Sequence, residues 1–221
     1  MHGKLIVIEG LDGSGKATQT KLLLEALKKE RGNVDTVSFP DYDSDSSALV
    51  RMYLGGQFGE HPNDVNSYAA SVFYAVDRYA SFKVKWEKAY ESGVIFVADR
   101  YTTSNALYQM AKLEKSQWDG YMDWLFDFEY GKLGIPRPDL VIFLSMSPFT
   151  SERLMNNRYG GDDSKKDIHE KYIDYQKKSR EAALYCAKCN GWKTIECDAD
   201  GTLRSAQDIA VDVRKAALEE L

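Results

Sequence analysis

A glycine-rich segment near the amino terminus carries the clearest chemical signal in this chain. Gly10 and Gly15 are separated by four residues, and Lys16 follows directly. Glycines at this spacing let successive backbone N–H groups turn toward one point, where the lysine adds positive charge. The pattern predicts a loop that binds the phosphate groups of a nucleotide. The alternative is a structural glycine turn with a surface lysine.

The elements expected on either side of this segment favour the phosphate loop. Residues 5–8 form the apolar run of a buried parallel strand, and the leucines within residues 16–29 indicate a helix. The amino terminus of such a helix adds positive potential at the loop. The residues expected to contact a nucleotide here are Gly10, Leu11, Asp12, Gly13, Ser14, Gly15, Lys16, Ala17 and Thr18.

Ala17 departs from the full pattern, because a serine or threonine at this position normally helps to hold Mg²⁺. Thr18 is a poor substitute, since one step along a helix turns the side chain by about 100°. We therefore expect Mg²⁺ to rest on phosphate oxygens, on water and on Asp99, which binds it directly or through water.

Composition and charge narrow the class of protein. The chain has 221 residues, of which 43% are hydrophobic and 29% charged, and this fits one α/β domain over residues 1–221. A net charge of −5 does not favour a nucleic-acid partner. We find no signal segment, no apolar run long enough to cross a bilayer and no disulfide framework among the three cysteines. These features predict a cytoplasmic protein that binds neither nucleic acid nor a membrane.

Strand and helix signals alternate along the chain, which predicts a three-layer α/β fold with a parallel sheet between helices. Five strands are expected, at residues 5–8, 34–39, 94–98, 140–144 and 192–197. Helices are expected at residues 16–29, 46–54, 64–92, 104–132, 148–157, 168–189 and 203–221. The polar segment 156–167 between two helices is either an ordinary solvated loop or a flap over the phosphate site.

A second candidate site follows the third expected strand, where Asp99, Arg100 and Tyr101 stand at its carboxyl end. Ligands of open parallel sheets bind at this edge. A carboxylate there can hold Mg²⁺, and an arginine can clamp a second phosphate through two hydrogen bonds. The alternative is an ion pair that caps the next helix. Ser104 is expected to be the cap residue of that helix.

Several separate motifs resemble, in the same order, those of the thymidylate kinase family of P-loop nucleoside monophosphate kinases. They are the phosphate loop, a Phe-Pro motif, an aromatic-x-x-x-Arg helix, the segment after the third strand, a Pro-Asp motif and an arginine pair. The matching stretches are residues 9–16, 39–40, 74–78, 99–109, 136–141 and 153–158. The resemblance covers nearly the whole chain and implies a P-loop NTPase fold with a flexible lid at about residues 156–168.

The resemblance implies an acceptor pocket for dTMP. Tyr74 would stack on the pyrimidine, Arg78 would hydrogen-bond its carbonyl edge, and Asp12 would face the sugar or the phosphate. The residues expected to bind dTMP are Asp12, Phe39, Arg51, Tyr74, Arg78, Arg100, Asn105, Tyr108 and Gln109. The alternative for Tyr74 and Arg78 is a partly buried aromatic and a surface charge on an amphipathic helix, and for Asn105, Tyr108 and Gln109 it is ordinary helix surface. In this family an arginine usually follows Phe-Pro, but here Asp41 and Tyr42 occupy that position. Arg51 on the next expected helix would supply the missing positive charge.

Phosphoryl transfer needs charge neutralisation and alignment more than covalent chemistry. The resemblance implies that Lys16 acts at the donor phosphates and Arg100 at the acceptor phosphate. Asp12 and Asp99 complete the catalytic residues expected in the sheet-edge segments.

The phosphate loop itself contains no arginine, so the resemblance implies an arginine from the lid. Arg158 is the best candidate to meet the transferring phosphoryl group, and Arg153 beside it is expected to contact ATP. The alternative for both arginines is that they are charged residues at a helix end and contact only solvent.

The function implied by the resemblance is transfer of the γ-phosphate of ATP, with Mg²⁺, to dTMP by a cytoplasmic homodimer. Two alternatives remain open. One is a kinase for another nucleoside or deoxynucleoside monophosphate, because base choice rests on a few pocket contacts. The other is a nucleotide-binding regulatory module that has lost catalysis, which Ala17 and Tyr42 suggest.

Overall fold

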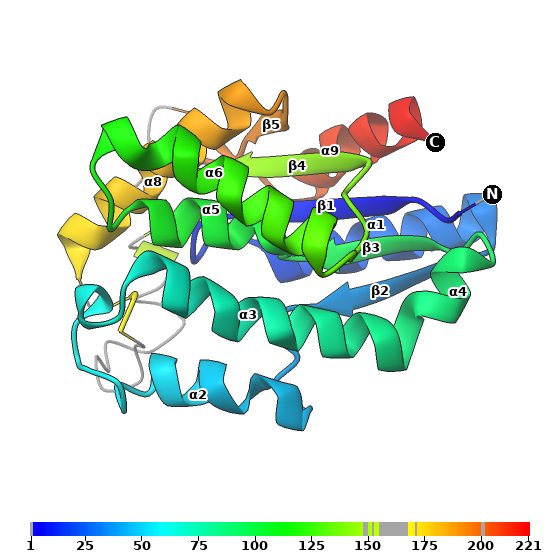
Figure 1. Ribbon diagram of the computed structural model, residues 1–221. Coiled ribbons are helices and arrows are strands. Elements are labelled where there is room, and N and C mark those ends of the chain that lie inside the picture. Colours follow the sequence, from blue (N-terminus) through cyan, green and yellow to red (C-terminus); the bar gives the residue numbers. More distant parts are fainter. Residues whose placement is uncertain (1, 148–149, 152, 155–167, 171, 200–201) are drawn as a thin grey trace.

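The structure is a computed structural model in which residues 2–147, 150–151, 153–154, 168–170, 172–199 and 202–221 are described (Figure 1). The lid expected at 156–168 lies outside the described residues except for Ile168, and Arg158 lies outside them as well. Of the helix expected at 148–157, only residues 150–151 and 153–154 are described, and these are helical.

A five-stranded parallel sheet forms the middle layer, in the order β2-β3-β1-β4-β5. The strands are β1 (Leu5–Gly10), β2 (Val34–Ser38), β3 (Ile95–Asp99), β4 (Leu140–Ser145) and β5 (Lys193–Glu196). All five expected strands are confirmed, with ends shifted by one or two residues. The central strand β1 is buried along its whole length, which explains its apolar sequence. The segments that follow β1 and β3 meet at the carboxyl edge of the sheet, on the left in Figure 1.

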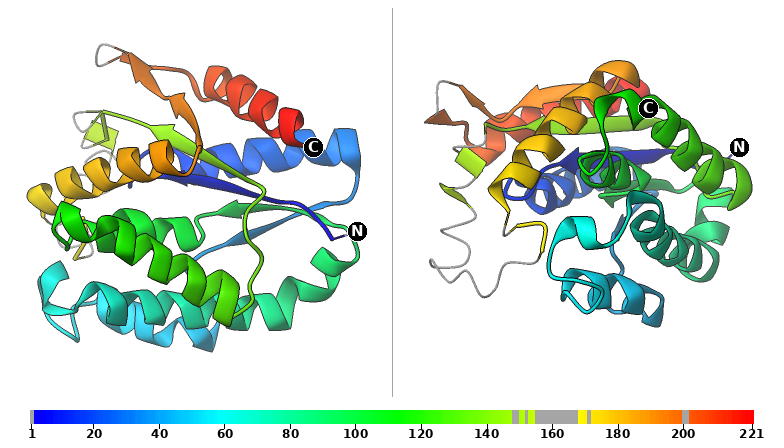
Figure 2. Two further views of the ribbon diagram at one scale, coloured as in Figure 1. Left: turned by 45° about the horizontal axis from the view of Figure 1, so that its top comes forward. Right: turned by 60° about the vertical axis from the view of Figure 1, so that its left-hand side comes forward.

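Helices cover both faces of this sheet (Figure 2). They are α1 (Lys16–Arg31), α2 (Ala48–Leu54), α3 (Ser67–Ser81), α4 (Glu87–Glu91), α5 (Thr102–Met110), α6 (Trp118–Phe126), α8 (Ile173–Cys189) and α9 (Ala206–Glu220). On one face Leu27 of α1 and Val213 of α9 pack with Ile6 of β1. On the other, Val7 of β1 packs with Trp86, so successive residues of β1 serve the two cores.

The helix expected over 104–132 is in fact two helices, and the structure corrects it. The indole Nε1 of Trp118 donates to the carbonyl oxygens of Met110 and Leu113, at 3.0 and 3.4 Å. It thereby provides a hydrogen-bond donor for the carbonyl group of Met110, the last residue of α5. Glu114 and Gln117 form a capping box before α6 begins. The break therefore depends on a tertiary contact and a cap rather than on a glycine or proline.

The helix expected over 64–92 is also interrupted, by a π-helical turn at Phe82–Trp86 between α3 and α4. The rings of Phe82 and Trp86 lie 4.6 Å apart and both pack against the sheet, so packing of the two aromatic side chains accompanies the wider turn. A second π-helical turn, Asp127–Lys132, follows α6. A short hairpin of β6 (Asp198–Ala199) and β7 (Thr202–Leu203) has no counterpart among the expected strands.

Helix α1 extends two residues beyond its expected end, whereas α2, α8 and α9 are shorter than expected. A 3₁₀ turn at Asp45–Ser47 precedes α2, and another at Pro62–Asp64 precedes α3. Helix α9 begins after Ser205, whose side chain accepts from the Asp208 N–H. Within the described part of the chain, no helix is both long and apolar enough to span a membrane.

Candidate active site

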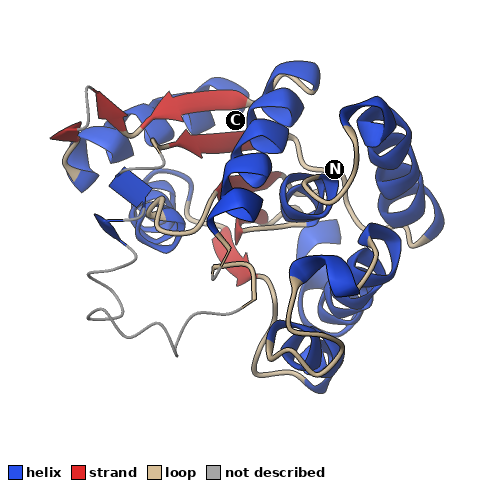
Figure 3. Ribbon diagram, turned by 90° about the vertical axis from the view of Figure 1, so that its left-hand side faces the viewer, coloured by secondary structure: helices blue, strands red, loops and turns tan. Residues whose placement is uncertain are grey.

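The phosphate loop joins β1 to α1 at the carboxyl edge of the sheet, which faces the viewer in Figure 3. Gly15 adopts a φ of 84°, in the left-handed region that favours glycine. Gly10 is required for space, because a Cβ atom there would lie 2.5 Å from Ser14 Oγ and 3.0 Å from the Leu144 carbonyl oxygen. Glycine is therefore required at both ends of the motif, at Gly15 by the backbone conformation and at Gly10 by the lack of space for a side chain.

Lys16 begins α1 and its side chain turns back to the loop. The residue is 7% exposed, and Nζ donates to the Leu11 carbonyl oxygen at 2.7 Å. Burial first, and then the charge of Arg100, lower the pKa of Lys16 to about 8. A bound anion would offset both effects and favour the charged amine. Ala17 and Thr18, in contrast, are exposed on the first turn.

Asp12, Arg100 and Tyr108 connect the phosphate loop to the segment after β3. The Arg100 guanidinium forms an ion pair with Asp12 Oδ1, and the Tyr108 hydroxyl donates to Asp12 Oδ2 at 2.9 Å. Burial alone would raise the pKa of Asp12, but the charges of Arg100 and Lys16 hold it well below its usual value. Arg100 also has a φ of 66°, which is strained for a residue with a side chain and is typical of functional sites.

A partly open cavity, lined by aromatic and polar side chains, lies beside the phosphate loop. Eight of the nine residues expected to bind dTMP line it, namely Asp12, Phe39, Tyr74, Arg78, Arg100, Asn105, Tyr108 and Gln109. The rest of the wall comes from Pro40, Tyr42, Leu54, Tyr101, Ser104 and His169. Asp12 therefore belongs both to the loop and to the cavity wall, and its ion-pair partner Arg100 lines the same cavity.

Arg51 is the one expected pocket residue that does not line this cavity. Its Nη1 donates to the carbonyl oxygens of Tyr42 and Ser44, at 3.0 and 3.1 Å. The side chain thus braces the loop between β2 and α2 from outside. It supports Tyr42, which lines the cavity, but it does not supply the missing positive charge there.

Arg78 is held in the cavity wall by a carboxylate that sequence reasoning missed. The residue is 1% exposed, and its Nε and Nη2 donate to Glu129 Oε2 and Oε1, at 2.7 and 2.6 Å. Burial alone would lower the pKa of Arg78, but the charge of Glu129 raises it. Glu129 stands in a helical stretch with several other acidic residues, so nothing local in the sequence singles it out.

Gln109 offers the cavity a carboxamide with no partner. The residue is 1% exposed, and neither its Nε2 nor its Oε1 has a hydrogen-bond partner among the described residues. A buried amide left in this way costs free energy, which a ligand with both a donor and an acceptor would offset.

Glu9 is a second buried carboxylate that sequence reasoning missed. It accepts hydrogen bonds from the Gly10 N–H at 2.9 Å, the Thr103 hydroxyl at 2.7 Å and the Ser104 hydroxyl at 2.9 Å. Helix α5 starts at Thr102, so Ser104 is inside the helix and does not cap it, contrary to expectation. An acidic residue at the end of an otherwise apolar buried strand was the available signal.

Asp99 ends β3 and suits a hard cation. Its Oδ1 is buried without a partner among the described residues, as is Ser14 Oγ in the loop, and the charge of Asp99 acts on Lys16. Oxygen donors of this kind fit Mg²⁺, which also keeps several waters. No group of three or more His, Cys, Asp or Glu residues in the described ranges could hold a metal. A cation here would therefore draw most of its ligands from phosphate and water.

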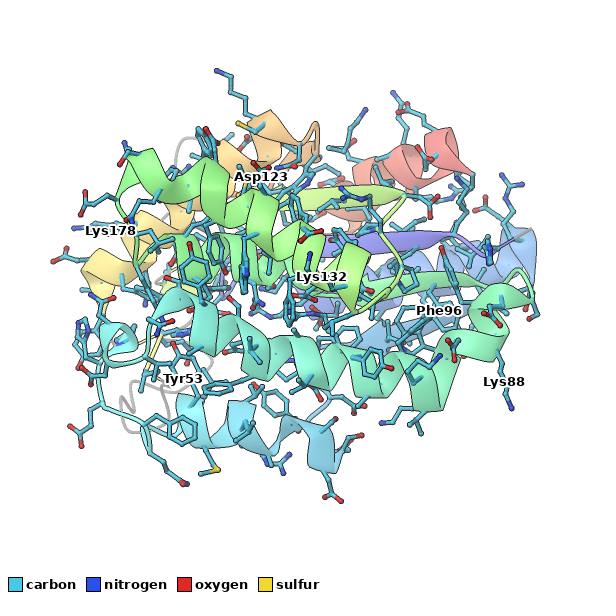
Figure 4. The ribbon with its side chains drawn as sticks, viewed as in Figure 1. Tyr53, Lys88, Phe96, Asp123, Lys132 and Lys178 are labelled. Carbon is cyan, nitrogen blue, oxygen red and sulfur yellow. The ribbon has the colours of Figure 1, made fainter. Side chains whose placement is uncertain are left out.

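A buried polar chain behind the cavity was not expected from the sequence. Lys112 Nζ donates to the Tyr53 hydroxyl at 2.8 Å and to the Val65 carbonyl oxygen at 2.9 Å. The Tyr53 hydroxyl lies 2.9 Å from His169 Nε2, and Figure 4 labels Tyr53 between α2 and α3. The His169 ring stacks on Tyr108, with 5.4 Å between the ring centroids. The chain thus joins α2 and α5 to the segment before α8.

The buried imidazole of His169 should make stability depend on pH. Burial, and then the charge of Lys112, lower its pKa from 6.5 to about 3. Between these values the unfolded chain binds one more proton, so the free energy of unfolding falls as pH falls, by about 1.4 kcal/mol per pH unit. His169→Phe keeps an aromatic ring but cannot titrate. From pH 6.5 to pH 5, wild type should lose about 1.6 kcal/mol more than this variant in urea unfolding, since the unfolded imidazole is already half protonated at pH 6.5. Equal losses would contradict the assignment.

These observations define the class of protein: a P-loop α/β protein whose nucleotide-binding loop opens beside a second, aromatic-lined cavity. The thymidylate kinase family profile matches residues 8–209. The chain therefore belongs to the thymidylate kinase family.

Individual relatives agree with this membership. The chain is 28% identical to a thymidylate kinase of Schizosaccharomyces pombe, over 96% of this chain and 91% of the relative. It is 31% identical to a probable thymidylate kinase of Thermococcus onnurineus, over 98% of both. Thymidylate kinase from Candida albicans has the same fold, with a TM-score of 0.71 and 22% identity over 99% of this chain and 92% of that one.

Proposed function

We propose that this protein transfers the γ-phosphate of ATP to dTMP, giving ADP and dTDP for the synthesis of dTTP. The observation that carries the proposal is the Asp12–Arg100 pair, which belongs both to the phosphate loop region and to the cavity wall. An ATP whose phosphates occupy the loop and a monophosphate in the cavity would meet at this pair. Such an arrangement favours transfer between two substrates over hydrolysis of one.

The donor half of the proposed site is the phosphate loop, residues 10–18. Its glycines allow the backbone to approach the phosphates closely, and the buried amine of Lys16 would neutralise their charge. Asp99 would hold Mg²⁺, directly or through water, and the ion, when bound to ATP, would neutralise charge on the phosphate oxygens.

Two arginines complete the proposed donor half. Arg153 is exposed in the helical segment after β4, and we propose that it contacts ATP. Arg158 stays a prediction made from the sequence, as the residue that meets the transferring phosphoryl group. A guanidinium suits this role because its planar fork matches a phosphoryl group with two hydrogen bonds.

The acceptor half of the proposed site is the cavity. Tyr74 and Phe39 provide aromatic surface for a flat base, and the guanidinium of Arg78 can donate to a carbonyl oxygen at its edge. Gln109 can both donate and accept. Arg100 would leave Asp12 in part to bind the acceptor phosphate, because a dianionic phosphate competes well for a guanidinium.

The proposal is tested by turnover of ATP with dTMP, dUMP, dCMP and dGMP, with the products separated and counted. We expect dTMP to have the highest kcat/KM and dCMP to lie on the order of 10²-fold below it, since a site that donates to a carbonyl rejects an amino group. A different acceptor ranking first would support the alternative monophosphate kinase. Binding of ATP with no transfer to any acceptor would support the regulatory module.

We further propose that the chain acts as a single domain over residues 1–221 and as a cytoplasmic homodimer. Tyr68 is 43% exposed on α3, Val76 and Tyr79 are exposed on the same helix, and the ring of Tyr68 lies 4.7 Å from that of Trp124 on α6. This apolar surface supports an interface with a second copy. The three cysteines are all free thiols, which supports a reducing compartment.

A further inference from the structure

Glu129 is the centre of a buried hydrogen-bond network one layer behind the cavity wall. Its side chain is fully buried and accepts from four donors, two on each oxygen. Oε1 accepts from Arg78 Nη2 at 2.6 Å and from Asn105 Nδ2 at 3.3 Å. Oε2 accepts from Arg78 Nε at 2.7 Å and from the Thr102 hydroxyl at 2.8 Å. A carboxylate can accept about four hydrogen bonds, so the acceptor positions of Glu129 are all occupied.

The network determines what Asn105 can offer to a ligand. Its Nδ2 donates to Glu129 and also to the Ser71 carbonyl oxygen at 3.2 Å, which uses both amide hydrogens. The capacity that remains is the acceptor Oδ1. A reversed amide would place Oδ1 against the Glu129 carboxylate and a second carbonyl oxygen, which is unfavourable in a buried site. The charge of Glu129 therefore selects one orientation of Asn105.

The same carboxylate determines what Arg78 can offer. Nε and one hydrogen of Nη2 are used by Glu129, and Nη1 lies 3.4 Å from the Tyr101 carbonyl oxygen. The hydrogens left on the two terminal nitrogens can only donate. Because Arg78 and Asn105 both line the cavity, a ligand meets a donor from one and an acceptor from the other.

We propose that Glu129 is the positioning residue that sets the base specificity of the cavity, by fixing a donor on Arg78 and an acceptor on Asn105. This inference rests on the proposed function, since it takes the ligand to be a pyrimidine nucleotide. Thymine carries a carbonyl oxygen next to an N–H, which complements this pair. Cytosine carries an amino group next to a bare ring nitrogen, and both positions would be mismatched. Glu129 acts without touching the base.

The experiment is Glu129→Gln, which keeps the shape of the side chain but replaces one acceptor oxygen with a donor. Asn105 is then free to reverse, and Arg78 loses a charged anchor. We expect the ratio of kcat/KM for dTMP to that for dCMP to fall by about tenfold or more, as for a lost hydrogen bond to a charged group. The change should be in KM for dTMP. KM for ATP should stay within about twofold, because the hydrogen bonds of Glu129 go to Arg78, Asn105 and Thr102 and none of these residues belongs to the phosphate loop.

Two further variants separate specificity from stability. Val213→Ala removes buried apolar atoms in α9, on the opposite face of the sheet, and should lower the Tm without changing the dTMP to dCMP ratio. If Glu129→Gln does not fold, Thr102→Val removes one donor from Glu129 and should shift the ratio in the same direction by a smaller factor.

The possible outcomes have distinct meanings. A wild-type enzyme that phosphorylates dTMP, with an unchanged ratio in Glu129→Gln, would overturn the role of Glu129 alone. If only Thr102→Val folds, an unchanged ratio in that variant has the same meaning. A wild-type preference for dCMP would overturn this inference together with the proposed function.

Discussion

Replacing Lys16 with alanine is expected to lower kcat for dTMP phosphorylation by about 10³-fold. The amine is buried, its Nζ lies 2.7 Å from the Leu11 carbonyl oxygen, and it stands on the first turn after the loop glycines. The structure therefore holds a positive charge where the donor phosphates would develop negative charge. In the variant this charge is lost, while the loop backbone that binds the nucleotide remains.

Lys21→Ala is the matched control, because Lys21 is an exposed lysine on the same helix. It should keep kcat within about twofold of wild type, as surface substitutions away from a site usually do. The measurement is steady-state turnover at saturating ATP and dTMP, with circular dichroism to verify folding. A Lys16→Ala enzyme with near-normal kcat would contradict the assignment of the donor site.

Replacing Arg100 with glycine is expected to reduce kcat/KM for dTMP by about 10³-fold, because the acceptor phosphate loses the charge and the hydrogen bonds of the guanidinium. Arg100 has a φ of 66°, so alanine at this position would lose the guanidinium and keep the backbone strain. Glycine adopts this conformation without strain and removes the side chain alone. The two variants together separate the guanidinium from the backbone.

Both Arg100→Gly and Arg100→Ala should be impaired to a similar degree if the guanidinium carries the effect. Arg100→Lys keeps the charge but loses the planar fork, and should recover only part of the activity. An active Arg100→Gly enzyme beside an inactive Arg100→Ala enzyme would assign the effect to the backbone and contradict the proposed phosphate contact. Initial rates over a range of dTMP concentrations distinguish these outcomes.

The sheet was predictable from the sequence because β1, β3 and β4 carry continuous apolar runs, and β2 and β5 are short β-branched segments in which apolar and polar residues mix. The phosphate loop was predictable because its residues are contiguous. The broken helices were not predictable in the same way. Between α5 and α6 there is no proline, and the break depends on where the indole of Trp118 meets the carbonyl oxygens of Met110, at the end of α5, and of Leu113 in the turn that follows. Packing across turns, rather than local propensity, decided these boundaries.

The candidate site likewise contains residues that the sequence could predict and residues that it could not. Residues that lie within short motifs, such as Asp12, Arg100 and Tyr108, come together as expected. Glu129 contacts Arg78 across 51 positions, and His169 contacts Tyr53 across 116, so no spacing in the sequence indicates either contact. Arg51 differs from these residues, because its side chain turns to the nearby carbonyl groups of Tyr42 and Ser44 and does not line the cavity.

The hydrogen bonds of Glu9 have a consequence for how two substrates would be brought together. One carboxylate joins the backbone at the start of the phosphate loop to Thr103 and Ser104 at the start of α5. The donor loop and the helix that lines the acceptor cavity are thereby fastened to each other at the edge of the sheet. The separation between donor and acceptor is then largely set before either substrate binds, so little orientational freedom is left to be lost in the reacting complex.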